Sequence, residues 1–236
     1  MNAIKRSIPN SITCLNLLFG CIAIVFVFHN RLPEASWMIA FAAIADFFDG
    51  MAARLLKAHS PIGKELDSLA DMVSFGVAPG MIIYQLIGTA PYNWMGLLVP
   101  IFAALRLAKF NIDTRQAFYF IGLPSPANAL LIASFPLILS HDNYWQSVYL
   151  SNVSFSTWFF IGIAIACSGL MVSPLKLFSL KIKDTSWANN KTRYLFLLIS
   201  IGCILALGYT AVPIIMVLYI ILSLLSKKSF EATPAS

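Results

Sequence analysis

Four aspartates interrupt apolar sequence as two pairs, Asp46 with Asp49 and Asp67 with Asp71. An ionised Asp near the centre of a membrane helix costs roughly 2.5–3.5 kcal/mol on insertion scales, so four would cost on the order of 10 kcal/mol. Acids in such positions are typically functional and have a specific partner. Carboxylate oxygens are the ligands that hard divalent cations prefer. The pattern therefore predicts a site for one or two ions such as Mg²⁺, Mn²⁺ or Ca²⁺.

The composition places these acids in a membrane protein. Of the 236 residues, 59% are hydrophobic and 11% are charged, and the mean hydropathy is +0.79. Because a soluble protein carries about 25% charged residues, we predict an all-α, polytopic membrane helix bundle without a separate soluble domain. The net charge of +6 suits cytosolic loops facing anionic lipid better than nucleic acid. The cysteines and histidines are scattered singly, which argues against a thiolate or imidazole metal site.

About eight apolar runs are long enough to cross a bilayer, which takes about 17–25 helical residues. The last two are short and separated only by the break from Gly208 to Pro213, so six spans plus a re-entrant pair is an alternative. We interpret the polar gaps at 140–154 and 179–193 as loops. The membrane domain would cover residues 1–228, as a six-helix catalytic core plus two helices, and residues 229–236 would form a disordered tail. The predicted spans are Ile8–Phe28, Ala35–Leu56, Pro61–Ile87, Asn93–Phe110, Gly122–Leu139, Phe155–Leu175, Tyr194–Gly208 and Tyr209–Leu225.

The basic residues predict the orientation of these spans. With the N-terminus in the cytosol, every Lys and Arg except Arg31 falls in a cytosolic loop or at a cytosolic helix end. Enrichment of basic residues on the cytosolic side is the rule in membrane proteins. We therefore predict that both termini are cytosolic.

The acid-bearing runs should form an antiparallel hairpin. Ser60 followed by Pro61 is a good helix start, with Ser as the N-cap and Pro at the first helical position. The chain would then turn near Ala58, between the runs 35–56 and 61–87.

In such a hairpin Asp46 lies at the depth of Asp71, and Asp49 at the depth of Asp67. Within each helix the two acids are three or four residues apart, so each pair lies on one face. At about 1.5 Å of rise per residue, the acids lie roughly 10–18 Å from the cytosolic turn. They would be buried and still reachable from the cytosol through a polar cavity.

Residues beside the acids favour a phosphate ligand. Gly50 and Ala53 leave room against the helix backbone, and Arg54, at the mouth near Gly63, could meet a phosphate. Two-metal sites clamp phosphoryl oxygens during in-line displacement. Polar residues that hold helices together would explain one Asp–Arg pair but not four acids at matched depth. Transport of a divalent cation would explain the acids but not the small residues or Arg54.

The same residues resemble the CDP-alcohol phosphatidyltransferase family, whose complete signature they match in type and spacing. The matching positions are Asp46-x2-Asp49-Gly50-x2-Ala53-Arg54-x8-Gly63-x3-Asp67-x3-Asp71. The resemblance implies displacement of CMP from a CDP-linked lipid by an alcohol, with two divalent ions, Mg²⁺ or Mn²⁺, on the diphosphate.

The resemblance also implies roles for single residues. It implies metal ligation by Asp46, Asp49 and Asp67, and it makes Asp71 the general base that also touches metal. The CMP part of the site would be lined by Gly50, Ala53 and Arg54 and closed by Gly63.

A second element lies on the first predicted helix. The run from Pro9 to Asn16 resembles the family's PNxxTxxN element, which meets the nucleotide and the diphosphate through Asn10, Thr13 and Asn16. Pro9 at a helix start, followed by Asn and Thr, is alternatively ordinary capping. Beside the main signature we favour the binding role.

Three further stretches resemble the branch of the family that uses serine. They are 75–79 (FGVAP), 105–111 (LRLAKFN) and 122–128 (GLPSPAN). The resemblance covers roughly Ile8 to Pro136, and it departs from the family pattern at Lys109, often Arg, and at Asn128, often a small residue. We expect Arg106, Lys109 and Asn111 to bind the acceptor, with Arg suited to a serine carboxylate. Anchoring at a cytosolic helix end is the alternative for Arg106 and Lys109.

The resemblance therefore implies transfer of a phosphatidyl group from CDP-diacylglycerol to L-serine, giving phosphatidylserine and CMP. The same chemistry with glycerol 3-phosphate or inositol phosphate as acceptor is the first alternative, and a divalent-cation transporter is the second. We expect a homodimer in a prokaryotic inner membrane, surrounded by membrane lipids, with the active site facing the cytosol and no nucleic-acid partner.

Overall fold

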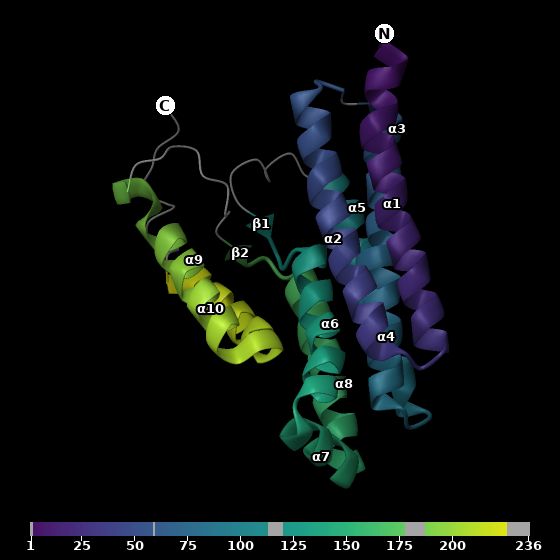
Figure 1. Ribbon diagram of the computed structural model, residues 1–236, viewed down its shortest axis with the longest axis vertical. Helices are drawn as coiled ribbons and strands as arrows, with labels where there is room; N and C mark the ends of the chain where they lie inside the picture. Colours follow the sequence, from purple (N-terminus) through teal and green to yellow (C-terminus); the bar gives the residue numbers. More distant parts are fainter. Residues whose placement is uncertain (1, 59, 113–119, 178–186, 226–236) are drawn as a thin grey trace.

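The computed structural model describes residues 2–58, 60–112, 120–177 and 187–225, and within them it is a bundle of helices (Figure 1). The helical class is therefore confirmed, with two two-residue strands that the sequence did not predict. These strands pair antiparallel, with Phe120 opposite Leu177. The elements are α1 (Asn2–Phe28), α2 (Leu32–Leu55), α3 (Pro61–Asp71), the π-helical turn η1 (Met72–Val77), α4 (Ala78–Ile87), the 3₁₀ turn η2 (Tyr92–Leu97), α5 (Leu98–Ile112), β1 (Phe120–Ile121), α6 (Ser125–His141), α7 (Asn143–Ser151), α8 (Val153–Val172), β2 (Lys176–Leu177), α9 (Trp187–Leu207), the 3₁₀ turn η4 (Gly208–Thr210) and α10 (Ala211–Leu225).

Helix α1 is the main packing partner of the acid-bearing helices. It lies along α2 and also contacts α3, η1 and α4, so it joins the two arms of the predicted hairpin. Helix α6 packs against α2, and α8 packs against α4 and α5. The pair α9–α10 lies at the edge of the bundle and meets it through contacts of η4 and α10 with α6 and β2 (Figure 1).

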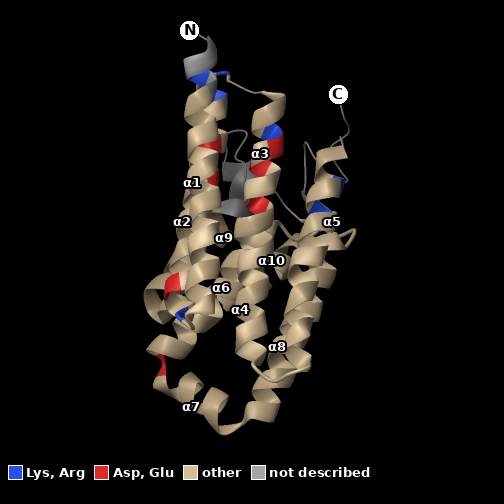
Figure 2. Cartoon of the chain, turned by 90° about the vertical axis from the view of Figure 1, so that its right-hand side faces the viewer, with Lys and Arg blue, Asp and Glu red and all other residues tan. Residues whose placement is uncertain are grey.

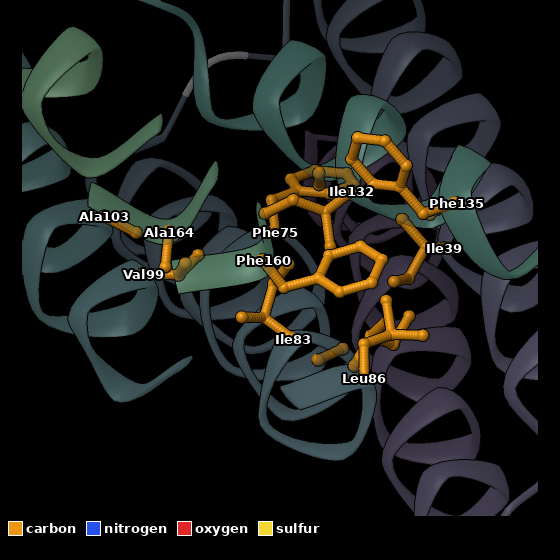
Figure 3. Close-up of a cluster of buried hydrophobic side chains, with 14 of the residues drawn as sticks. Ile39, Phe75, Ile83, Leu86, Val99, Ala103, Ile132, Phe135, Phe160 and Ala164 are labelled. Atoms are coloured by element: carbon orange, nitrogen blue, oxygen red, sulfur yellow. The ribbon is translucent and has the colours of Figure 1, made fainter. Parts of the chain in front are cut away.

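A buried apolar cluster fixes these helices relative to one another. Phe75 of η1, Ile39 of α2, Ile132 of α6 and Phe160 of α8 meet in this cluster, although they are far apart in the sequence (Figure 3). Lipid is as apolar as these side chains, so their contribution in a membrane is close packing rather than removal from water. The cluster holds the acid-bearing helices α2 and α3–η1–α4 in one rigid arrangement.

The start of α3 is as the sequence predicts. Ser60 is the N-cap in extended conformation, its Oγ accepts a hydrogen bond of 3.1 Å from the Gly63 amide, and Pro61 is the first helical residue. The cap satisfies one of the amides that a helix start leaves without a partner. The chain therefore turns between Leu55 and Pro61, as expected.

Two local expectations were wrong. Pro9 lies inside α1 rather than at its start, because the helix already begins at Asn2. The segment 140–154 is not a loop, since it contains helix α7, whose first amides are capped by the Asp142 carboxylate. The gap 179–193 is only partly described, and its end belongs to α9. The predicted tail, residues 229–236, lies outside the described residues.

Five helical segments among the described residues are long and apolar enough to cross a membrane: Ser7–Phe28, Pro61–Ile87, Tyr92–Ile112, Val153–Val172 and Tyr194–Leu224. The last combines the two C-terminal runs, which the turn η4 divides at Gly208 with φ of 56°. Helices α2 and α6, also expected to span, are not among the five. Helix α2 carries Glu34, Asp46, Asp49 and Arg54, and α6 has 17 residues. The chain is thus a membrane protein with several apolar helices, and eight spans stay a prediction.

Gly122 is the glycine whose replacement should damage this fold most clearly. It lies directly after β1 with φ of 74°, and a Cβ there would overlap the carbonyl oxygen of Met171. We expect Gly122→Ala to destabilise the protein by at least about 2 kcal/mol, since the left-handed backbone alone costs about 1–2 kcal/mol. Thermal unfolding in detergent measures the change. Gly169→Ala in α8, where a Cβ meets nothing within 4 Å, is the control and should not lower the unfolding temperature, since Ala is the better helix former.

Candidate active site and metal centre

Three carboxylates converge between α2 and α3. Asp46 and Asp49 of α2 and Asp67 of α3 each offer an oxygen, and these oxygens all lie within 4.8 Å of one another. Figure 2 shows acidic residues, in red, on neighbouring helices in the upper half of the bundle. The spacing of the acids along each helix brings them to one face, and the turn at Ser60 brings the two faces together.

The three acids have no basic partner within the part of the chain that the structure describes. Among the side chains that the structure describes, the only ion pair within 4.0 Å joins Arg31 to Glu34, at the connection between α1 and α2. Asp49 is 5% exposed, and its Oδ2 atom is buried without a hydrogen bond. Two unit charges 4.8 Å apart repel by about 3.5 kcal/mol at an effective dielectric constant of about 20. The cluster could therefore hold a cation, and its all-oxygen donor set fits a hard divalent ion.

The carboxylates open onto a cavity of about 580 Å³. Its walls come from α1, α2, the turn after α2, and α3, so α1 forms one wall between the acid-bearing arms. This volume lies within the range of small-molecule sites, about 300–1,000 Å³. The lining residues are Pro9, Asn10, Thr13, Asp46, Asp49, Gly50, Ala53, Ala58, Ser60, Pro61, Gly63, Lys64 and Asp67.

The small residues of the signature make room in this cavity. A Cβ added to Gly50 would meet no atom within 4 Å, whereas one added to Gly63 would come within 3.0 Å of Asn10 Oδ1. Gly50 therefore leaves space for a ligand, and Gly63 lets α1 approach α3. Arg54 is exposed and does not line the cavity, and its Nε donates to the Gly50 carbonyl oxygen over 2.9 Å.

The polar residues of α1 lie in two different surroundings, the cavity and the neighbourhood of Asp71. Asn10 and Thr13 line the cavity, and the Thr13 hydroxyl donates to the Pro9 carbonyl oxygen over 3.1 Å. The Pro9 carbonyl oxygen thus lies next to the Thr13 side chain, whose hydroxyl is the donor. Asn16 is fully buried, and its Nδ2 donates to Asp71 Oδ1 over 3.1 Å.

Asp71 is not one of the three acids whose oxygens all lie within 4.8 Å, but its charge interacts with theirs, and it lies at the junction of α3 with the π-helical turn η1. Within that turn, the Ser74 hydroxyl donates to the backbone oxygen of Asn16 over 2.9 Å. Asn16 is thus held through its backbone and in turn holds Asp71 through its side chain. This arrangement fixes one oxygen of Asp71 and leaves the other available for chemistry.

The three residues expected to bind an acceptor lie in different surroundings. Arg106 is 8% exposed, and its Nη1 donates to the Ser125 hydroxyl over 2.9 Å. Asn111 instead ties the end of α5 to α3, because its Nδ2 donates to Ser68 Oγ over 2.9 Å. Lys109 is exposed. Of the three, Arg106 alone is buried in the bundle.

Comparison with known proteins gives the family. The family described as CDP-alcohol phosphatidyltransferase matches residues 6–168, from the start of α1 to most of α8.

The chain belongs to the CDP-alcohol phosphatidyltransferase family.

The similarity to individual relatives extends beyond the motifs. A Mycobacterium leprae protein named CDP-diacylglycerol–serine O-phosphatidyltransferase is 33% identical over 228 residues, 92% of this chain and 72% of that protein. A Helicobacter pylori protein of the same name is 32% identical over 221 residues, 90% of this chain and 87% of its own. The Bacillus subtilis protein of that name is 42% identical over 141 residues, 56% of this chain and 80% of its own. The similarity thus reaches past Pro136, where the recognised motifs end.

Membership makes this chain a membrane transferase of phospholipid biosynthesis, and its acid cluster is one that could hold metal. Several residues of the phosphatidyltransferase site escaped sequence reasoning. Ser60 and Pro61 were recognised as a helix start but not as walls of the cavity, and Lys64 was seen only as a cytosolic charge. Ser74 carries no signal in the sequence, since its partner is 58 residues away, and Ser125, although inside the stretch 122–128, was given no role because its partner Arg106 is 19 residues away.

Proposed function

We propose that this chain transfers a phosphatidyl group from CDP-diacylglycerol to L-serine, giving phosphatidylserine and CMP. The observation that carries the proposal is the convergence of Asp46, Asp49 and Asp67, without a basic partner among the described residues, on a cavity beside Gly50. The names of the three relatives support serine as the acceptor. Glycerol 3-phosphate or inositol phosphate would bring a phosphate, which favours several basic side chains, whereas Arg106 is the one buried basic residue among those described.

The residues that would hold two divalent ions, Mg²⁺ or Mn²⁺, are Asp46, Asp49 and Asp67, with Asp71 contributing. Such ions neutralise charge on the diphosphate and on the departing CMP. Gly50 and Ala53 leave space for the CMP moiety, and Asn10 and Thr13 face it from α1. Arg54 lies near the mouth and would meet a phosphate after leaving the Gly50 carbonyl oxygen.

The serine hydroxyl is a poor nucleophile at neutral pH and needs a base. Its oxygen forms a bond to the phosphorus that carries diacylglycerol, while the bond from that phosphorus to the CMP oxygen breaks. CMP leaves with the electron pair of that bond, and the hydroxyl proton passes to Asp71, which later releases it to water. Asn16 orients Asp71 for this transfer through the 3.1 Å hydrogen bond.

For the membrane, we propose about eight spans with both termini cytosolic, as counting of basic residues indicates. Among the described residues Arg31 lies at the α1–α2 connection, whereas Arg54, Lys57 and Lys64 flank the opposite turn beside the cavity. The acyl chains would stay in the bilayer while the CDP head group enters the cavity. A homodimer in a prokaryotic inner membrane remains part of the proposal.

Release of labelled CMP from CDP-diacylglycerol tests the proposal. The purified chain in detergent is given Mg²⁺ or Mn²⁺ and, in separate reactions, L-serine, glycerol 3-phosphate or inositol phosphate. We expect CMP release and formation of phosphatidylserine with serine alone. CMP release with glycerol 3-phosphate or inositol phosphate instead of serine would show that the acceptor is that phosphorylated alcohol. Uptake of divalent metal into liposomes without any CMP release would support the transporter.

Filling the cavity should impair lipid binding without harming the fold. A Cβ added at Gly50 meets no atom within 4 Å, and leucine is a better helix former than glycine, so we expect Gly50→Leu not to lower the unfolding temperature. The KM for CDP-diacylglycerol should rise at least about tenfold, since the side chain takes ligand space and each lost contact weakens binding. Gly162→Leu, at another glycine without neighbours, is the control. An unchanged KM in Gly50→Leu would place the nucleotide elsewhere.

Arg106 is proposed to hold the serine carboxylate. Arg106→Lys should raise the KM for serine about tenfold, because an ammonium cannot reproduce the planar fork that binds a carboxylate through two hydrogen bonds. The KM for CDP-diacylglycerol should hardly change. Steady-state kinetics with serine varied at saturating CDP-lipid measures both. Anchoring at a helix end predicts no kinetic effect, since Lys anchors as well as Arg.

A further inference from the structure

A second group of buried polar side chains lies at the first turn of α6. Ser125 begins this helix and Asn128 lies one turn on, and both are fully buried. Among the described residues, neither amide atom of the Asn128 side chain has a hydrogen-bond partner, and Nε of Arg106 has none either. A buried polar group without a partner costs about 1–3 kcal/mol. A leucine would fill the position of Asn128 without that cost, so the asparagine calls for a functional explanation.

This group lies close to the proposed base. Arg106 reaches the first turn of α6 through its hydrogen bond to Ser125, and α6 packs against η1, the turn that follows Asp71. The charges of Asp71 and Arg106 are near enough to interact. A small acceptor could therefore place its hydroxyl at Asp71 and its other groups at Arg106 and α6.

We propose that Asn128, with Arg106 and the first turn of α6, forms a pocket that recognises an α-amino acid by both of its charges. The carboxylate meets the Arg106 guanidinium and the partial positive charge at the start of α6. The ammonium donates to Asn128 Oδ1, which has no other donor. This inference rests on the proposed function, and it adds the residue that reads the amino group.

Two serine analogues separate the two charges. 3-Hydroxypropanoate keeps the hydroxyl and carboxylate of serine but lacks the amine, and ethanolamine keeps the hydroxyl and amine but lacks the carboxylate. For the unmodified chain, kcat/KM should be much higher for L-serine than for either analogue. In Asn128→Leu the preference for serine over 3-hydroxypropanoate should fall about tenfold or more, the effect of losing a hydrogen bond to a charged group. Its preference for serine over ethanolamine should stay, since both carry the amine.

The reciprocal variant and a matched control complete the test. Arg106→Lys should lower the preference for serine over ethanolamine and leave that over 3-hydroxypropanoate intact. Asn93→Leu is the control, because Asn93 is also buried with an unpartnered carbonyl oxygen but lies in η2. Asn128→Asp, which keeps an oxygen acceptor, should retain the preference for serine. Should Asn128→Leu fail to fold, Asn128→Ala provides the same comparison.

The outcomes separate this inference from the proposed function. Equal losses on serine and 3-hydroxypropanoate in the Asn128 variants, or no loss on serine, would overturn the role of Asn128 while CMP release with serine persists. Absence of CMP release with serine in the unmodified chain would overturn the proposed function itself.

Discussion

Replacing Asp46, Asp49 or Asp67 by Asn is expected to lower CMP release by at least about 10³-fold, because electrostatic stabilisation of a reacting phosphoryl group contributes on that scale. The three carboxylate oxygens lie within 4.8 Å of one another, so each variant removes a charge from one shared donor set. None should unfold the protein. Removing one of three mutually repelling acids should leave the metal-free protein as stable as before, or more stable.

Thermal unfolding with and without metal separates these two effects. The unmodified chain should gain stability on addition of Mg²⁺ or Mn²⁺, as expected when an ion binds the folded state alone, and the three variants should not. Asp142→Asn is the matched control, since Asp142 caps α7 far from the cluster and Asn caps equally well. Retained activity in any two of the three variants would show that the metal site has been misplaced.

Asp71→Asn should behave differently, lowering kcat by about 10²–10⁴-fold, the range for loss of a general base. The asparagine can still accept the hydrogen bond from Asn16 Nδ2, so the local structure should persist. Binding of CDP-diacylglycerol should partly survive, because Asp46, Asp49 and Asp67 remain. Single-turnover CMP release and equilibrium binding of the CDP-lipid measure the two quantities separately.

The contrary outcome for Asp71 is also informative. Complete loss of CDP-lipid affinity in Asp71→Asn, with the same loss of metal-dependent stabilisation as in Asp46→Asn, would make Asp71 primarily a metal ligand. The base would then have to be sought among other groups near the cavity.

What could be predicted from the sequence was local in origin. The N-cap at Ser60, the faces carrying each acid pair and the turn between α2 and α3 all follow from spacing within about 30 residues. The convergence of the two arms followed as well: oxygens of Asp46, Asp49 and Asp67 lie within 4.8 Å of one another. Asp46, expected level with Asp71, is near enough for the two charges to interact.

The remainder depends on contacts between distant segments. Asn16 and Asp71, which form a hydrogen bond, are 55 positions apart in the sequence. Arg106 and Ser125, which also form one, lie in two different motifs, and the sequence between these motifs does not predict their contact. The resemblance gave Asn10 and Thr13 a place in the site, but the wall that α1 adds to the cavity follows from its packing against both α2 and α3. Helix α7 escaped prediction because it has only nine residues, in which Asn, Gln and Ser alternate with aromatic and apolar residues, and because its cap at Asp142 is a single side chain.

The π-helical turn η1 has a consequence for how this sequence can change. Its wider hydrogen-bonding pattern lies between the acid-bearing α3 and the core-forming α4. An α-helix turns by about 100° per residue, so one residue gained or lost here would rotate every α4 side chain away from its present neighbours. Insertions at the outer ends of these helices would shift only a connecting turn. We therefore expect the length of the segment Met72–Val77 to be more restrained than its composition, so that related sequences differ in its side chains before they differ in its number of residues.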